Sequence, residues 1–201
     1  MLVGDRMTRD VVTVLDGATV AEGLRLMDER GVNRLPVVDA EGRLSGIVSD
    51  MDLRIAEAAG GLADRIRSVM TTRLVTISEY CTLEKAATLM RQKGVGGLPV
   101  VRGSQLVGII TDGDVFDAFT HLLGADQPGV RLTVEVPNSR TVVTLLDEIT
   151  KAGGDILGLG IMSMDAGRRL LAVKVSGIST VQAQAVCDAL GLTLTDLLEE
   201  H

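Results

Sequence analysis

Two short segments of the chain combine residue types that suit the binding of a ribonucleotide. Residues 46–52 read GIVSDMD, and residues 108–114 read GIITDGD. In each, an apolar run ends at a hydroxyl residue where a helix is expected to begin, and a carboxylate follows three positions later. The unpaired N–H groups of a helix start favour phosphate, and a Ser or Thr hydroxyl adds a donor. The carboxylate suits the two hydroxyls of a ribose, as an acidic residue does in other nucleotide folds.

The same residues also fit a purely structural role. Ser49 and Thr111 are good N-cap residues, and Asp52 and Asp114 complement the positive end of a helix dipole. The sequence leaves both interpretations open.

The two segments belong to an internal repeat. When the sequence is shifted by 63 residues, Met7-Thr8 falls on Met70-Thr71 and LPVV at 35–38 falls on LPVV at 98–101. After one residue is lost in a turn, a shift of 62 aligns Ser49 with Thr111. A self-match of this length indicates two copies of one structural unit.

Each copy predicts the order strand, helix, strand, strand, helix. We expect short strands at 11–14 and 74–77, helices that end at Gly31 and Gly94, and paired strands around the turns at 41–42 and 103–104. Thr19 and Glu22 form a capping-box pattern. One copy of about 55 residues makes a marginal core, so we expect the two to pack together with clefts related by pseudo-twofold symmetry.

Composition narrows the function classes. The chain has 201 residues, a net charge of −7 and three aromatic residues, so we expect an aliphatic core and no nucleic-acid partner. No apolar run has the length of a membrane span and no signal peptide is evident, so we expect a cytoplasmic protein without membrane association. Cys81, Cys187, His121 and His201 show no metal or catalytic spacing. We therefore expect no enzymatic activity and no catalytic cofactor.

The doubled pattern LPVV, turn, G-I-(V/I)-(S/T)-x-x-D resembles a tandem pair of CBS domains over about residues 5–122. The resemblance implies a regulatory module that binds AMP, ADP, ATP or S-adenosylmethionine between the repeats. It implies Asp52 and Asp114 as ribose acceptors and Ser49 and Thr111 near phosphate, with Arg34 and Arg54 as candidate phosphate partners. The expected adenine pockets comprise Val12, Thr13, Arg34, Leu35, Pro36, Val75, Thr76, Gly97, Leu98 and Pro99.

After residues 124–129, which read as a linker, the pattern restarts as strand, helix, strand, strand, helix, with a last strand or a helical tail near 192–198. A turn is expected at 165–167. This order is ferredoxin-like and resembles an ACT domain. The whole then resembles CBS/ACT proteins of the acetoin-utilisation type. ACT domains that bind amino acids usually have glycine between the first strand and helix. Here PNSR occupies 137–140, with Asn138 able to adopt a left-handed conformation, so an association role is favoured.

The predicted fold is therefore mixed α/β (α+β), with CBS domains at 5–62 and 63–123 and an ACT-like domain at 130–201. The leading functional hypothesis is a nucleotide-responsive regulator that forms a homodimer. We expect the bound nucleotide to shift the relative angle of the repeats, and the ACT-like domain or a regulated protein partner to respond to that change. The alternatives are a ligand-free dimerisation module, with a link to acetoin metabolism, and, ranked last, an enzyme.

Overall fold

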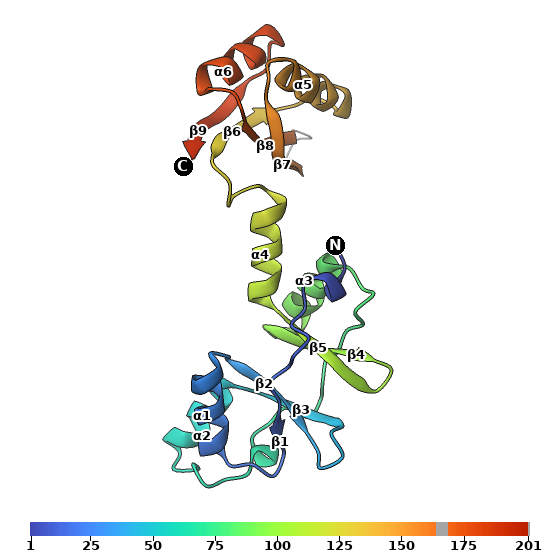
Figure 1. Ribbon diagram of the computed structural model, residues 1–201, viewed down its shortest axis with the longest axis vertical. Coiled ribbons are helices and arrows are strands. Elements are labelled where there is room, and N and C mark those ends of the chain that lie inside the picture. The colour runs from blue at the N-terminus through green and yellow to red at the C-terminus, as the bar shows by residue number, and fades with distance from the viewer. Residues whose placement is uncertain (164–168, 201) are drawn as a thin grey trace. The chain divides into compact units, whose positions relative to one another are not determined.

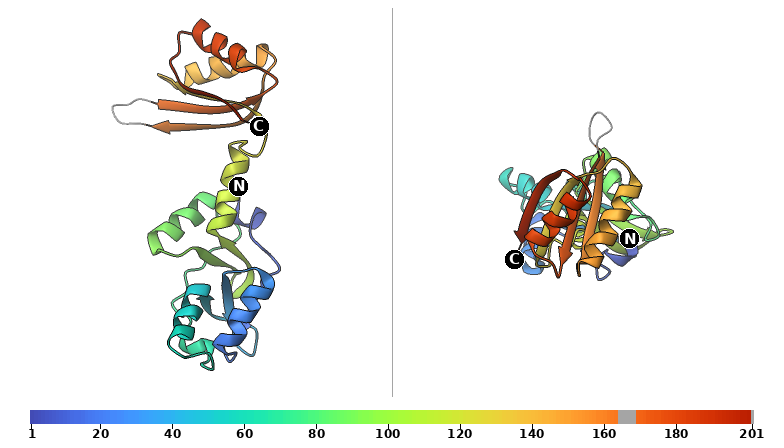
Figure 2. Two further views of the ribbon diagram at one scale, coloured as in Figure 1. Left: turned by 90° about the vertical axis from the view of Figure 1, so that its left-hand side faces the viewer. Right: turned by 90° about the horizontal axis from the view of Figure 1, so that it is seen from above.

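The computed structural model describes residues 1–163 and 169–200. Its backbone forms two compact units, Met1–Val115 and Phe116–His201. The elements are labelled in Figure 1, and further views are given in Figure 2. The expected turn at 165–167 and His201 lie outside the described residues. No helix in the described part is long and apolar enough to cross a bilayer.

The first repeat forms a three-stranded sheet with two helices. Its elements follow the order β1 (Val14–Leu15), α1 (Val20–Arg30), β2 (Arg34–Val38), β3 (Leu44–Ser49) and α2 (Asp50–Ala58). Strand β1 runs parallel to β2, and β2 runs antiparallel to β3. The two helices pack against each other, as Figure 1 shows.

The second repeat has the same two-stranded hairpin between two helices. It comprises α3 (Leu83–Lys93), β4 (Gly97–Arg102), β5 (Gln105–Thr111) and α4 (Asp112–Leu122). Its hairpin has the register of the first: Pro99 pairs with Ile109 as Pro36 pairs with Ile47.

The predicted first strand of each repeat was largely wrong. Residues 11–13 form no strand, and only Val14–Leu15 pairs with β2. Residues 74–77 form no strand, and Ile77 makes a single parallel bridge to Val100. Val14 and Ile77 are buried, so their apolar side chains serve the core although the backbone before them makes no ladder.

The helix ends follow the local rules expected from the sequence. Thr19 caps α1, and its hydroxyl oxygen accepts from the N–H of Glu22 at 3.2 Å while the Glu22 carboxylate accepts from the N–H of Thr19 at 2.7 Å. This contact lowers the pKa of Glu22. Gly31 and Gly94 end α1 and α3 with φ values of 62° and 65°, in the left-handed region that favours glycine.

The segment that leads into each repeat is hydrogen-bonded to the other repeat. We call residues 1–8 and 62–71 the leading segments. In the first, Val3 and Gly4 donate to the carbonyls of Cys81 and Glu79, and Thr8 exchanges two backbone hydrogen bonds with Ile109. Figure 1 shows the N-terminus beside α3.

The second leading segment mirrors the first. Ile66 donates to the carbonyl of Ala18, and Thr71 exchanges two backbone hydrogen bonds with Ile47. Ile66 is fully buried in the core of the first repeat. The leading segment that precedes each repeat in the sequence therefore packs in the structure with the other repeat.

The core of the first unit is aliphatic, as the composition predicts. Leu35, Val48 and Leu53 are inaccessible to solvent, whereas the aromatic Tyr80 is among the exposed large apolar side chains. The ten buried residues of the first repeat's cluster are all Val, Leu, Met, Ala or Ile.

Beyond residues 116–122 of α4, the second unit forms a four-stranded antiparallel sheet with two helices. Along the chain it comprises β6 (Gly129–Glu135), α5 (Ser139–Lys151), β7 (Asp155–Ser163), β8 (Arg169–Ser176), α6 (Thr180–Ala189) and β9 (Leu194–Glu200). The strand order across the sheet is β7-β8-β6-β9, so β7 and β9 are its edges. Figure 2 shows both helices on one face of this sheet.

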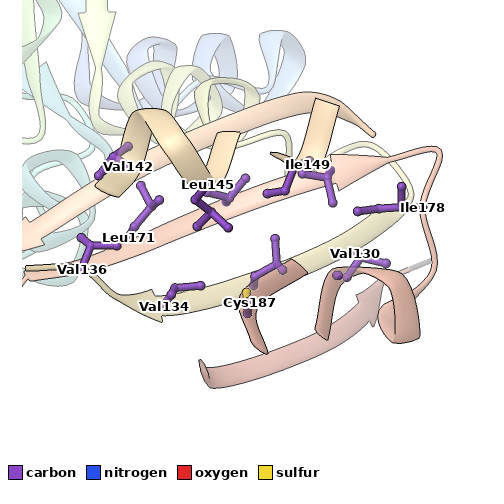
Figure 3. Packing of buried hydrophobic residues seen from close by; sticks show 13 residues of the cluster. Val130, Val134, Val136, Val142, Leu145, Ile149, Leu171, Ile178 and Cys187 are labelled. Carbon is purple, nitrogen blue, oxygen red and sulfur yellow. The ribbon is translucent and has the colours of Figure 1, made fainter. Parts of the chain in front are cut away.

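The core of the second unit lies between that face and the helices. Leu145 and Ile149 of α5 contact the inward side chains of β6 and β8, and Cys187 of α6 completes the layer (Figure 3). On β8 Lys174 is also inaccessible to solvent, and its ammonium contacts the Glu200 carboxylate, which Arg131 contacts at 3.3 Å.

Two expectations for this unit are decided by the backbone. The last segment is a strand, β9, and not a helical tail. Asn138 is extended (φ −162°) and not left-handed, because it caps α5: its side-chain oxygen accepts from the N–H of Thr141 at 3.1 Å. An N-cap residue adopts this extended conformation, so no left-handed turn forms there.

Candidate functional site

The helix starts at Ser49 and Thr111 have matching geometry. The N–H and hydroxyl of Ser49 donate to Oδ2 of Asp52 at 2.9 and 2.6 Å, and the N–H of Asp52 donates to Oγ of Ser49 at 3.2 Å. Thr111 and Asp114 make the same three bonds at 2.7, 2.7 and 3.3 Å. Within the described part of the chain, Oδ1 of each aspartate takes no hydrogen bond, so one oxygen of each carboxylate is held and the other is available to a ligand.

A cavity of about 290 Å³ lies at the first of these helix starts. We call it the Ser49 cavity. The first repeat contributes Arg34, Ile47, Ser49 and Asp52, and the remaining lining residues are Thr71, Gly94, Val95, Gly96 and Gly97.

A second cavity, of about 320 Å³, lies at the other helix start. We call it the Thr111 cavity. The second repeat contributes Ile109, Thr111, Asp112, Gly113 and Asp114, and the other lining residues are Thr8, Asp10, Val11, Val12, Gly31, Val32, Asn33 and Arg34. Both volumes are at the lower end of the range for small-molecule sites.

The exchange of leading segments explains why each cavity is built from both repeats. Thr71 reaches the Ser49 cavity because it pairs with Ile47, and Thr8 reaches the Thr111 cavity because it pairs with Ile109. The turn after the first helix of one repeat, residues 31–34 or 94–97, closes the cavity of the other. The predicted pseudo-twofold relationship is thus visible in the lining residues.

Arg34 breaks this symmetry. It lines both cavities, and its Nη2 lies 3.6 Å from Oδ2 of Asp112. The repeat places glycine, Gly97, at the equivalent position. A β-carbon on Gly96 would overlap the Arg34 guanidinium, so glycine at 96 leaves the space that this side chain occupies.

Asp50, the counterpart of Asp112, has a different partner. It accepts from Nε of Arg54 at 2.8 Å within α2, and this hydrogen bond raises the pKa of Arg54. Arg54 also lies 3.8 Å from Asp28 and lines neither cavity. The structure therefore places Arg34 at both cavities and holds Arg54 on a helix surface.

About half of the residues predicted for the site line one of the cavities. These are Val12, Arg34, Ser49, Asp52, Gly97, Thr111 and Asp114. The others line neither: Thr13, Leu35, Pro36, Val75, Thr76, Leu98 and Pro99. The Leu-Pro pairs are buried within the hairpins, and Leu35 and Leu98 have no exposed surface.

Sequence reasoning missed the lining residues Asp10, Asp112 and the backbone of 94–96. The repeat contains a signal for residues 94–96, because GV at 31–32 recurs at 94–95, and each pair lies one residue before a predicted site residue, Arg34 or Gly97. The sequence predicts Gly31 and Gly94 only as the residues that end two helices.

Among residues 1–163 and 169–200, the remaining reactive side chains give no second candidate site. Cys187 is buried, which raises its thiol pKa, and His121 contacts Asp126 at 3.5 Å. Among the described residues no group of three or more His, Cys, Asp or Glu side chains is arranged to hold a metal ion.

The sequence profile of the CBS domain matches residues 3–59 and 66–121. Among curated relatives, a CBS domain-containing protein of Dictyostelium discoideum is 32% identical over 136 residues, which span 61% of this chain and 94% of that protein. CBS domain-containing protein YhcV of Bacillus subtilis is 36% identical over 115 residues, spanning 56% of this chain and 81% of YhcV.

Solved structures agree with this match. The CBS domain pair of protein MJ0100, in complex with 5′-methylthioadenosine and S-adenosyl-L-methionine, aligns with a TM-score of 0.56 and 28% identity, over 59% of this chain and 95% of that one. A putative acetoin utilization protein (AcuB) from Vibrio cholerae aligns with a TM-score of 0.57 and 33% identity, over 63% of this chain and 96% of that one.

Some relatives are named as enzymes, but the match covers a small part of them. The homoserine O-acetyltransferase of Methanohalobium evestigatum is 31% identical over 114 residues, which are 23% of its length.

Proposed function

Because the chain belongs to the CBS domain family, we propose that it is a regulatory protein that binds an adenosine ligand in the Ser49 and Thr111 cavities. The observation that carries this proposal is the repeated pairing of a held carboxylate with a cavity. At both helix starts the hydroxyl residue fixes one oxygen of a carboxylate that lines the cavity, and the other oxygen takes no hydrogen bond among the described residues. The adenosine ligands bound by the CBS pair of MJ0100 are consistent with this chemistry.

The chemistry assigns a role to each part of the cavity. The available oxygens of Asp52 and Asp114 would accept from ribose hydroxyls. Ser49 and Thr111, with the helix starts they cap, would lie on the 5′ side of the ligand, where unpaired N–H groups favour a phosphate. Val12, Ile47 and Ile109 give apolar contact for a purine ring.

A ligand in either cavity would contact both repeats, since both repeats line it. Binding would therefore favour one arrangement of the repeats over another, in proportion to its difference in affinity for the two. The second unit or a protein partner would respond to that shift.

Isothermal titration calorimetry with AMP, ADP, ATP and S-adenosylmethionine tests the proposal. We expect at least one of them to bind, and Asp52→Ala with Asp114→Ala to abolish binding. Glu22→Ala is a matched control, because Glu22 makes the same capping-box contacts with Thr19 but lines neither cavity. The proposal is rejected if no ligand binds or if the double variant binds like the wild type.

For the second unit we propose an ACT-like domain that associates with a second copy of the chain. Its βαββαβ order and strand order support an ACT-type, ferredoxin-like fold. Edge strand β7 exposes Leu159, Ile161 and Met162, and an edge with unpaired backbone groups is a template for another strand. We expect a dimer by sedimentation equilibrium and a monomer for Ile161→Lys. A wild-type monomer at all concentrations contradicts association.

A further inference from the structure

The charged residues that line the two cavities, apart from Asp52 and Asp114, sum to opposite net charge. The Ser49 cavity then has Arg34 as a charged lining residue and no further carboxylate among those described. The Thr111 cavity has Asp10 and Asp112 against the same Arg34. The pseudo-twofold repeat that makes the cavities alike in shape therefore makes them unlike in charge.

Arg34 is the cation shared by both cavities, and its present contact is weak. Its Nη2 lies 3.6 Å from Asp112, and the side chains are 29% and 52% exposed. A partly exposed ion pair at this distance contributes little to stability. A phosphate offers Arg34 paired oxygen acceptors and a higher charge, so it would readily replace the carboxylate.

The glycines at 96 and 97 leave room for the ion pair of Arg34 and Asp112 at the wall of the Ser49 cavity. A β-carbon on Gly96 would overlap Nη2 of Arg34 and lie 2.6 Å from Oδ2 of Asp112. Cδ of Arg34 would lie 3.1 Å from a β-carbon on Gly97, and the guanidinium occupies the place of one on Gly96. Both glycines line the Ser49 cavity, so the arginine lies over its wall. Any larger residue at 96 would exclude the arginine from this position.

Building on the proposed function, we propose that the cavities select adenosine ligands by charge. The Ser49 cavity takes the phosphate-bearing nucleotide, with Arg34 on its phosphate. In the Thr111 cavity the repulsion of phosphate by Asp10 and Asp112 outweighs the attraction of the helix start. This cavity takes an adenosine derivative whose 5′ group is uncharged or cationic, such as a thioether or a sulfonium. Transfer of Arg34 to a phosphate frees Asp112 and further favours a cation in the Thr111 cavity.

Calorimetry with AMP and 5′-methylthioadenosine, alone and together, tests this selection. We expect one AMP per wild-type chain, and one 5′-methylthioadenosine that still binds when AMP is saturating. Asp52→Ala should remove AMP binding alone. Asp114→Ala should remove the 5′-methylthioadenosine binding that is measured at saturating AMP.

Variants of the charged residues make the test specific. Arg34→Ala should weaken AMP binding at least about tenfold, the effect of one charge-assisted hydrogen bond, without weakening 5′-methylthioadenosine in the Thr111 cavity. Arg54→Ala is the matched control, since Arg54 lines neither cavity. Asp10→Asn with Asp112→Asn should create a second AMP site, and the control Asp50→Asn should not.

The outcomes separate this inference from the proposed function. Two equivalent AMP sites in the wild type, loss of AMP binding in Asp114→Ala but not in Asp52→Ala, or unchanged AMP affinity in Arg34→Ala would each overturn the charge selection and leave adenosine binding intact. If ADP or ATP binds but neither AMP nor 5′-methylthioadenosine does, the selection alone is rejected. If none of AMP, ADP, ATP, 5′-methylthioadenosine and S-adenosylmethionine binds, both the selection and the proposed function are rejected.

Discussion

Oγ of Ser49 donates a 2.6 Å hydrogen bond to Oδ2 of Asp52, within the cap of α2 and at the wall of a cavity. The two roles that the sequence left open for these residues are therefore compatible. The helix cap holds the carboxylate at a fixed position, and a carboxylate held in place loses less conformational entropy when it binds a ligand.

Substitutions at Ser49 should show whether the hydroxyl group of this residue, and not its size, stabilises α2. Ser49→Ala removes the acceptor for the N–H of Asp52 and is expected to lower the free energy of unfolding by about 1 kcal/mol. Ser49→Thr, which copies Thr111, should keep the wild-type value within about 0.5 kcal/mol. Urea denaturation measures both. Equal stability of the Ala and Thr variants would show that the hydroxyl does not cap α2.

Gly108→Ala should loosen the first leading segment. A β-carbon there would lie 2.5 Å from Sδ of Met7 and 3.0 Å from the carbonyl oxygen of Thr8, so the segment must move. We expect a loss of about 1–3 kcal/mol and faster proteolysis near residues 1–8. Gly17→Ala is the control, since nothing lies within 4 Å of its β-carbon. Similar stability of the two variants would contradict close packing at Gly108.

The two cysteines should differ in reactivity toward a thiol reagent. Cys187 is inaccessible and burial raises its pKa, which disfavours the reactive thiolate, whereas Cys81 is partly exposed. We expect one thiol per chain to react with Ellman's reagent in the native state and two in guanidinium chloride. Cys81→Ser should leave no rapidly reacting thiol, and rapid reaction in that variant would show that α6 opens readily.

The contact between Lys174 and Glu200 should make the second unit sensitive to acid. Lys174 lowers the pKa of Glu200 in the folded chain, so the contribution of this pair is present above the unfolded value of about 4.3 and is lost as pH falls through the folded pKa. Wild type should exceed Glu200→Gln in Tm at pH 7, with the difference shrinking toward pH 3. A difference that stays constant with pH would exclude this ionisation as its source.

Much of the architecture could be predicted because local signals and the repeat agreed. Thr19 and Glu22 marked a helix start, Gly31 and Gly94 marked helix ends, and the LPVV segments marked the hairpins. The strands at 11–14 and 74–77 are longer in the prediction than in the structure. Val14 and Ile77 are buried and pair with a neighbouring strand, whereas residues 11–13 and 74–76 form no strand, because an apolar β-branched run does not by itself supply a pairing partner.

The candidate site could be predicted where residues close in sequence also contact each other, as Ser49 and Asp52 do in the cap of α2. It was not predictable where the contributions come from the other repeat. Asp10 follows Thr8, which pairs with Ile109 at the Thr111 cavity, and Gly96 lies in the turn of the second repeat that closes the Ser49 cavity. Leu35 and Leu98 are expected at the site from the family resemblance, but their side chains have no exposed surface and line neither cavity.

The exchanged leading segments mean that the two halves of the first unit are interlocked. A chain cleaved near residue 60 should keep its halves together without denaturant, because each fragment retains a strip of backbone bonded into the other. A single repeat produced alone would lack the leading segment that pairs with it. Its own leading segment would be left free to pair with a second copy of the same repeat. Two such copies would form a dimer by exchanging their leading segments. Joining the two chains end to end would then give a continuous tandem repeat with the same exchanged pairing.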